Sequence, residues 1–180
     1  QDIKVVNLGL DMAYFDHLDD IRQANSNPVI DATITTMIDF YNVITVKRGL
    51  DLNKPRSFMF EMTTDKGSIP INELIRLVSE NRIAEWFESF TQLPYSKAFD
   101  DYIEKMKDGT IETFQLEQLE TEYMYQMLQE EQLTSNEVAP LLFYLYRKEM
   151  EIANLRLVLN GRISGISTEK IRERMRPVYD

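Results

Sequence analysis

Residues 39–50 read DFYNVITVKRGL, and residues 151–162 read EIANLRLVLNGR. Each stretch starts with an acidic residue, has Asn three residues later, and continues with a mainly apolar run up to a Gly. We call the shift along the chain that carries Asp39 onto Glu151 the repeat offset. Side chains at positions i and i+3 share one face of an α-helix. The sequence therefore places a carboxylate and an amide side by side, twice, inside an apolar helix.

The similarity extends outward from the two stretches at the same repeat offset and without a gap. The matched pairs are Pro28 with Pro140, Asp39 with Glu151, Asn42 with Asn154, Val46 with Val158, and Gly49 with Gly161. Proline is favoured in the first turn of a helix and glycine just past its end. Each copy therefore predicts one long helix that runs from its proline to its glycine.

An amphipathic helix with a Leu-acid-x-x-Tyr pattern precedes each long helix. The pattern comprises Leu10, Asp11, Tyr14 and Phe15 in the first copy, and Leu119, Glu120, Tyr123 and Met124 in the second. Sequence identity between the two copies is low. The duplication is therefore a hypothesis that rests on the order of the matched residues and on the proline and glycine that bound each long helix. We predict two helical repeats, residues 1–115 and 116–180.

The polar pair has two interpretations. In the first, it ties the helix to a neighbouring backbone turn, because a buried amide without partners costs about 1–3 kcal/mol. In the second, it is a functional polar site. A second copy favours the structural interpretation, since architecture repeats with a duplication whereas a working site usually degenerates in one copy.

Helix is expected almost throughout, and the predicted fold class is all-α. A first helix from Asn7 to about Ala24 precedes the long helix that starts at Pro28, which we assign as helix in spite of its β-favouring threonines and valines. Residues 50–70 are expected to be irregular. The other predicted helices span about 71–80, 82–91, 94–107 and 112–131, then a helix opened by a capping box at residues 134–137 and ending at Asn160, and last 168–175.

Composition limits the classes of partner. The 180 residues include 30 Asp and Glu against 20 Lys and Arg, for a formal net charge of −10, and the pI is about 4.7. Nucleic acids and anionic membranes attract basic faces, so a basic protein partner fits better. The absence of cysteine excludes disulfides and thiolate chemistry. No apolar run is expected to reach the ~18–20 residues that cross a bilayer.

Catalytic motifs are absent from the sequence. His17 is the one histidine and lies in the polar stretch FDHLDD, where a surface role is expected. The acidic clusters lack the spacing of a Ca²⁺ loop. The aromatic run comprises Trp86, Phe87, Phe90, Tyr95 and Phe99, and it suits core packing or, less well, an interface. We assign no catalytic, cofactor-binding or metal-binding residue, expect no cofactor, and leave the partner-binding residues unassigned.

Several of these features together resemble the C subunit of the rotary V/A-type ATPases, which is called d in the eukaryotic vacuolar enzyme. They are the E-x-x-N-L-R core from Glu151 to Arg156, Gly161, the tail GISTEKIRERM (165–175), Asp11 with Tyr14 and Phe15, the DFYN helix that ends in KRG, and the PINEL stretch at Pro70. The resemblance covers nearly the whole chain, and its specificity rests on the order and spacing of loose helical patterns.

The resemblance implies repeated helical-hairpin units arranged about a pseudo-threefold axis as a funnel-shaped socket. It implies a non-enzymatic component at the cytoplasmic face of a membrane complex, which binds the central-shaft D and F subunits and the membrane proteolipid ring and so couples ATP hydrolysis or synthesis to H⁺ or Na⁺ transport. No nucleic acid and no direct insertion into the bilayer are expected. Two repeats stand where the family has three, and the sequence starts at Gln1, so we expect that an N-terminal unit is missing.

Two other functions stay open on the sequence alone. One is an all-helical scaffold or adaptor unrelated to rotary ATPases. The other is an enzyme that uses carboxylates on its long helices, which retention of a metal through purification would favour. The transported ion, the direction of ATP turnover and the side chains that meet the shaft cannot be read from these residues.

Overall fold

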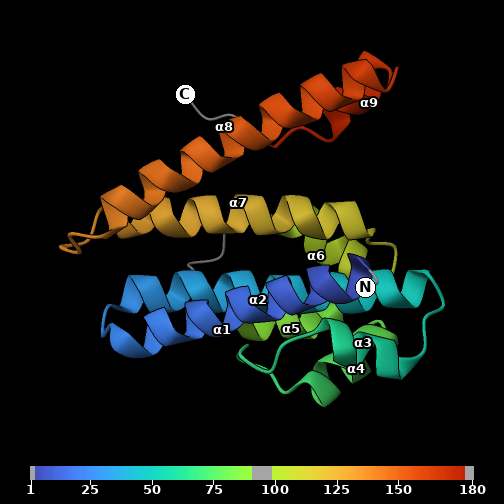
Figure 1. Ribbon diagram of the computed structural model, residues 1–180, viewed down its shortest axis with the longest axis horizontal. Helices are drawn as coiled ribbons and strands as arrows, with labels where there is room; N and C mark the ends of the chain where they lie inside the picture. The colour runs from blue at the N-terminus through green and yellow to red at the C-terminus, as the bar shows by residue number, and fades with distance from the viewer. Residues whose placement is uncertain (1–2, 91–98, 177–180) are drawn as a thin grey trace. The chain divides into compact units, whose positions relative to one another are not determined.

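The computed structural model describes residues 3–90 and 99–176, and the regular structure within these ranges is helical (Figure 1). The helices are α1 (Ile3–Ala24), α2 (Pro28–Asp51), α3 (Arg56–Met62), α4 (Ile71–Ser79), α5 (Ile83–Phe90), α6 (Asp100–Lys107), α7 (Thr113–Glu131), α8 (Ala139–Ile163) and α9 (Thr168–Glu173). The predicted all-α fold class is confirmed.

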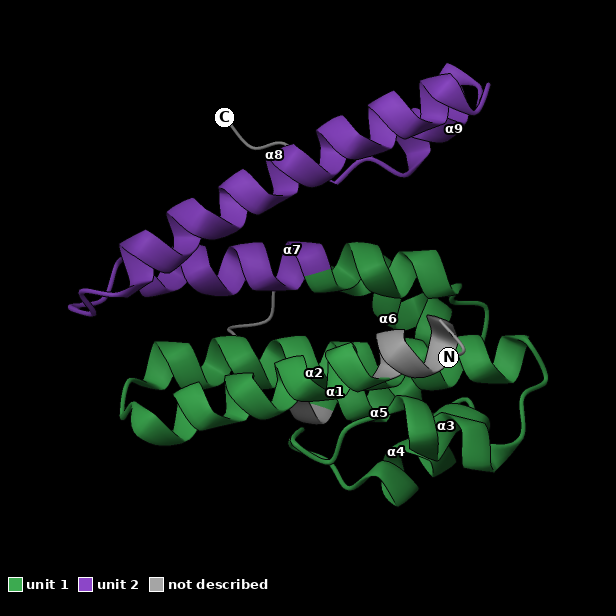
Figure 2. Ribbon diagram, viewed as in Figure 1, with its two compact units in different colours: residues 1–120 green, residues 121–180 purple. Residues whose placement is uncertain are grey.

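The chain forms two compact units, residues 1–120 and residues 121–180 (Figure 2). The boundary falls inside α7, so the first turns of this helix belong to unit 1 and the remainder to unit 2. The predicted division at 115 and 116 concerns sequence repeats rather than compact units, and it stays a prediction.

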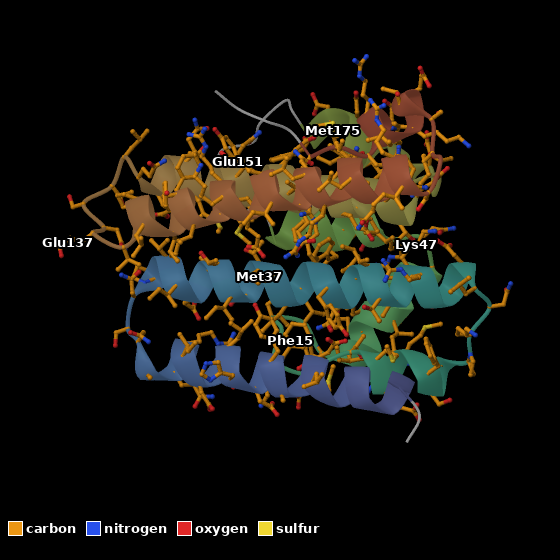
Figure 3. The ribbon with its side chains drawn as sticks, turned by 45° about the horizontal axis from the view of Figure 1, so that its top comes forward. Phe15, Met37, Lys47, Glu137, Glu151 and Met175 are labelled. Atoms are coloured by element: carbon orange, nitrogen blue, oxygen red, sulfur yellow. The ribbon has the colours of Figure 1, made fainter. Side chains whose placement is uncertain are left out.

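Helix α2 forms the centre of unit 1, with α1, α3 and α4 packed against it. Its start is fixed by Asn27, whose side-chain oxygen accepts hydrogen bonds from the backbone N–H groups of Val29 and Ile30. Phe15 of α1 lies between α1 and α2 (Figure 3) and packs on Tyr41 with 4.4 Å between ring centroids. Burial on several faces explains why the threonines and valines of α2 do not prevent a helix, since tertiary packing overrides propensity.

By length and composition, α2 is also apolar enough to cross a bilayer, contrary to the expectation from sequence. More than half of its most apolar window is buried inside the protein. A core helix of a soluble protein passes the same test, and unit 1 provides the packing that such a core helix needs.

Several predicted boundaries are wrong. Helix α1 begins at Ile3 rather than at Asn7, and the region from 50 to 70, expected to be irregular, contains α3. Helices α4 and α5 match the predictions within about two residues, whereas α6 begins at Asp100. The start expected for that helix, residue 94, lies outside the described residues.

The predicted capping box at residues 134–137 does not form. Helix α8 begins at Ala139 without a side-chain cap. Thr134 instead donates its hydroxyl hydrogen to the carbonyl oxygen of Glu131 and accepts from the N–H of Asn136, whose own side-chain oxygen accepts from the N–H of Val138. Short polar side chains readily bond to nearby backbone in this way, and here they build the turn between α7 and α8.

Candidate functional site

The amide of Asn42, in the middle of α2, binds the backbone of Thr64. Its Nδ2 donates to the carbonyl oxygen of Thr64 at 2.9 Å, and its Oδ1 accepts from the N–H of Thr64 at 3.0 Å. Asn42 is 1% exposed. Both polar groups of this buried side chain are therefore satisfied by one residue of the loop after α3, as buried amides require. We call this pair of bonds the Asn42 clamp.

The amide of Asn154 makes the same two bonds in unit 2. Its Nδ2 donates to the carbonyl oxygen of Arg176 and its Oδ1 accepts from the N–H of Arg176, both at 2.9 Å. Each asparagine thus binds the backbone 22 residues further on, so Thr64 and Arg176 are themselves related by the repeat offset. The geometry supports the structural interpretation of the repeated asparagine, and we call this second pair of bonds the Asn154 clamp.

The two glycines at the matched positions lie inside their helices, which corrects the prediction that they end them. A Cβ on Gly49 would lie 3.1 Å from Cγ of Met59 in α3, and one on Gly161 would lie 2.7 Å from Cδ1 of Ile171 in α9. Met59 and Ile171 are again related by the repeat offset. Glycine at these positions lets the following short helix pack closely against the long one, and it does not end the long helix.

The helices end two residues beyond their glycines, at Asp51 and Ile163. The chain then takes the left-handed conformation at Asn53 (φ 52°) and at Gly165 (φ 68°). Asparagine and glycine are the residues that adopt this conformation most readily. The ends of the two long helices are therefore also related by the repeat offset. Both helices end later in the chain than the glycines predicted.

The acidic partners of the two asparagines differ. Asp39 is buried, and its carboxylate accepts from the N–H of Ser68 at 2.8 Å and from the Ser68 hydroxyl. Gly67 leaves room for this contact, because a Cβ there would collide with Oδ1 of Asp39. Glu151 on α8 (Figure 3) forms an ion pair at 2.8 Å with Lys148 of the same helix. Only the asparagine of the polar pair therefore has the same role in both units.

Burial raises the pKa of Asp39, although the two bonds from Ser68 and the charge of Arg22 act in the opposite direction. Asp19 lies nearby on α1 and is also buried. Burial alone would raise its pKa too, but the Arg22 guanidinium at 2.5 Å, the Gln23 amide at 2.7 Å and the Lys66 ammonium at 3.7 Å together hold the pKa below its ordinary range. The two carboxylates are therefore shifted in opposite directions.

We expect Asp39→Asn to raise the free energy of unfolding at pH 7. Because the folded-state pKa of Asp39 is raised, the parent protein loses stability as pH rises from the ordinary carboxyl pKa through the raised one. The variant has no carboxyl group at residue 39 and does not lose this stability. The difference in free energy of unfolding between variant and parent should therefore decrease on acidification, by at most about 1.4 kcal/mol per pH unit. Urea unfolding between pH 4 and pH 7 measures the trend.

Asp19→Asn is the matched control for this measurement. The folded-state pKa of Asp19 is lowered, so its carboxylate stabilises the fold above the ordinary carboxyl pKa, and this contribution is lost as pH falls below that value. The variant should have a lower free energy of unfolding than the parent at pH 7, and this difference should become smaller as the pH falls. An Asp39→Asn advantage that grew in acid would contradict the assignment.

The other residues considered from sequence are placed as follows. His17 is exposed on α1, as expected. Trp86, Phe87 and Phe99 are buried, and the Phe87 ring has a tilted contact with Trp86 and an edge-on contact with Phe99, which confirms core packing for these three. The side chain of Phe90 and the whole of Tyr95 lie outside the described residues. Within the described ranges, no three His, Asp or Glu side chains are grouped so that they could hold a metal ion.

A cleft of about 740 Å³ opens in unit 1 beside the Asn42 clamp. It is lined by Met12 and Asp16 of α1 and by residues between Phe60 and Asn72, including Thr64 of the clamp. Sequence reasoning missed this cleft because its two walls come from distant parts of the sequence, which only the packing of α1 against α2 brings together.

Comparison with known proteins identifies a family and a relative. Residues 1–174 match the family model described as ATP synthase (C/AC39) subunit. Over 148 residues, 82% of this chain, the sequence is 32% identical to the C subunit of the V-type sodium ATPase of Enterococcus hirae. The matched part is 44% of the length of that relative. No solved structure matches the chain.

Proposed function

This chain belongs to the ATP synthase (C/AC39) subunit family, and from that membership we propose that it is a non-catalytic part of the central stalk of a V/A-type ATPase. In this role it forms part of a socket that links the rotating shaft, made of the D and F subunits, to the membrane proteolipid ring. It thereby couples ATP hydrolysis or synthesis to ion transport, as a peripheral component on the cytoplasmic face. The family match over residues 1–174 carries the proposal.

The recurring contacts support a repeated unit within this socket. The clamps, the helix-packing glycines and the left-handed helix ends all correspond between α2–α3 and α8–α9 at the repeat offset. We propose that α1–α3 and α7–α9 are copies of one hairpin unit, in the predicted repeats 1–115 and 116–180, within a pseudo-threefold funnel. A coupling that transmits torque needs elements fixed to one another, and each clamp fixes the middle of a long helix to the chain that follows it.

We propose that unit 1 binds a basic surface of the shaft, and the distribution of charge between the two units supports this. Residues 1–120 contain 21 Asp and Glu against 12 Lys and Arg, whereas residues 121–180 contain 9 against 8. Unit 1 therefore holds −9 of the net charge of −10. Opposite charge steers association and is screened by salt, so a salt-dependent contact with a basic partner falls on unit 1.

Calorimetric titration of this chain with the D and F subunits at two salt concentrations tests the proposal. We expect saturable binding that weakens as salt rises. Neutralising three exposed acids of α1 (Asp11, Asp16 and Asp20 to Asn) should weaken binding at low salt about three- to tenfold, since exposed charges contribute fractions of a kcal/mol each.

The matched control neutralises three exposed acids of unit 2 (Glu137, Glu149 and Glu169 to Gln), and it should bind as the parent does. Affinity that is insensitive to salt would remove the electrostatic part of the proposal. No binding by the parent, together with none by the same chain extended with an N-terminal repeat, would remove the shaft-coupling role itself.

A further inference from the structure

The cleft of unit 1 has a lining that is both apolar and acidic. Its volume of about 740 Å³ lies in the range of ligand-binding sites, about 300–1,000 Å³. The apolar side chains that line it belong to Met12, Phe60, Ile69, Pro70 and Ile71. The lining also contains the carboxylates of Asp16 and Asp65, and no lysine or arginine is among the described residues that form it. Such a lining suits a ligand that carries a cationic group on an apolar stem.

The acidic end of the cleft has more carboxylates than cations. Asp19 is paired with Arg22 at 2.5 Å. The Lys66 ammonium lies 3.7 Å from Asp19 and 3.9 Å from Asp16, so two carboxylates share this one cation. Asp65 is exposed, and no ion pair of its carboxylate occurs within the part of the chain that the structure describes. One further cation at this end would therefore be attracted.

Two other lining residues already bind a guanidinium of the chain itself. The guanidinium carbon of Arg56 lies 5.7 Å from the centroid of the Phe60 ring. Its Nη2 donates to Oδ1 of Asn72 at 3.3 Å. Phe60 still exposes 40% of its surface. Because arginine stacks on aromatic rings and pairs with carboxylates through two parallel bonds, the lining favours arginine over lysine as the cation of the ligand.

The hydroxyl of Thr64 supplies a hydrogen-bond donor to the cleft. The Asn42 clamp uses only the backbone of Thr64, and the residue lines the cleft while it is 6% exposed. Its Oγ1 accepts from the N–H of Lys66 at 3.4 Å. Among the described residues, no acceptor is found for the hydroxyl hydrogen. A carbonyl oxygen of a ligand would accept it, and a peptide backbone provides such an oxygen.

Side chains of α2 hold the loop that forms one wall of the cleft. The hydroxyl of Tyr41 donates to the carbonyl oxygen of Met62 at 2.9 Å, and Asp39 accepts from the N–H of Ser68 at 2.8 Å. These bonds lie on either side of the Asn42 clamp. In unit 2, Ala153 stands at the position matched to Tyr41 and has no hydroxyl. The loop of unit 1 is therefore held by more bonds than the repeated asparagine alone provides, and a wall held in place lowers the entropy cost of binding.

We infer that the cleft of unit 1 binds an arginine side chain in a short extended segment of a basic protein partner. Asp16 and Asp65 pair with the guanidinium, Phe60 and Met12 contact its methylene stem, and the hydroxyl of Thr64 donates to a backbone carbonyl oxygen of the segment. The choice of a protein as the source of the arginine rests on the proposed function, whereas the chemistry of the cleft does not depend on it.

NMR titration of the isotope-labelled chain with a basic peptide tests the inference. The probe is the pentapeptide Ala-Arg-Leu-Arg-Ala, acetylated and amidated at its ends. The control peptide has citrulline, the neutral isostere of arginine, in place of both arginines. We expect saturable shifts of backbone amide signals between residues 60 and 72. The citrulline peptide should bind at least about fivefold more weakly, because the charge-assisted bonds to the carboxylates are lost.

Variants of the chain locate the binding. Asp16→Asn combined with Asp65→Asn should weaken binding of the arginine peptide about three- to tenfold, since exposed ion pairs contribute fractions of a kcal/mol each. Thr64→Val keeps the backbone groups of the clamp and should weaken binding about two- to fivefold. The matched control is Glu112→Gln, at an exposed acid of unit 1 outside the lining, which should bind as the parent does. The amide spectrum of each variant reports whether it is folded.

Shifts centred on the cleft, which the paired aspartate changes weaken and Glu112→Gln does not, support the inference. Shifts that do not saturate, equal affinity for the citrulline peptide, or equal weakening by Glu112→Gln overturn it. Argininamide is a second control, and equal affinity for it would assign the cleft to a small guanidinium compound and overturn the protein source. No shaft subunit is present in this titration, so the inference can fail while the D and F subunits still bind, and the reverse.

Discussion

Replacing Phe40 with alanine is expected to lower the free energy of unfolding by about 3–5 kcal/mol, the usual cost of removing a buried aromatic side chain. Phe40 is fully buried and touches Trp86 and Phe87, so the truncation leaves a cavity between α2 and α5. Trp86 is the only tryptophan in the sequence. Its fluorescence during urea unfolding therefore reports on unit 1 at the site of the change.

The matched control is Ile152→Ala, at the corresponding position of α8. Ile152 is 49% exposed, so its truncation removes little buried surface and should cost less than about 1 kcal/mol. Circular dichroism during urea unfolding follows this variant, because unit 2 contains no tryptophan. A cost at Ile152 equal to the cost at Phe40 would show that this face of α8 is already covered in solution.

Asn42→Leu is expected to cost about 2–4 kcal/mol, since it leaves the N–H and the carbonyl oxygen of Thr64 without their partner in a buried loop and each such group costs about 1–3 kcal/mol. Leucine is similar in volume, so the loss reports on hydrogen bonding rather than on a cavity. Thermal and urea unfolding measure it, and at this chain length each kcal/mol corresponds to about 2–4 °C in Tm.

Asn154→Leu separates the structural interpretation of the repeated asparagine from a functional one. It should cost less than Asn42→Leu, because the bonds of Asn154 to Arg176 are only partly buried, and it should lower Tm before it changes the affinity for the shaft subunits. An unchanged Tm with a loss of shaft binding is the result that would refute the structural interpretation.

The helical class, the order of the helices and the matched prolines and asparagines could be predicted from sequence. They depend on the spacing of apolar residues and on local residues such as proline that favour a helix start. The prediction for α2 succeeded by giving length and apolar period more weight than the β-favouring threonines. The same local reasoning failed at Gly49 and Gly161. A glycine after an apolar run usually ends a helix, and only the approach of Met59 and Ile171 shows that these two do not.

The structural interpretation predicted a backbone partner for the repeated asparagine, but the residue that supplies this partner could not be predicted. Neither Thr64 nor Arg176 carries a side-chain signal for its role in a clamp, and the loop that presents Thr64 is positioned by α3, a helix that falls where irregular structure was expected. Surface residues that bind a partner are hard to predict from sequence for a related reason, because exposed charges leave no periodic pattern.

The use of backbone partners has a consequence for how far the two halves of this chain can diverge. The two bonds of each clamp need the asparagine side chain and, 22 residues later, only a backbone N–H and a carbonyl oxygen, which both the threonine and the arginine found there supply. Proline lacks the N–H and would remove one of the two bonds. If the two hairpins are copies of one unit, as we propose, changes at the partner positions lower the sequence identity between them while both clamps are kept, and the asparagine in the middle of each long helix is the residue that the clamp preserves.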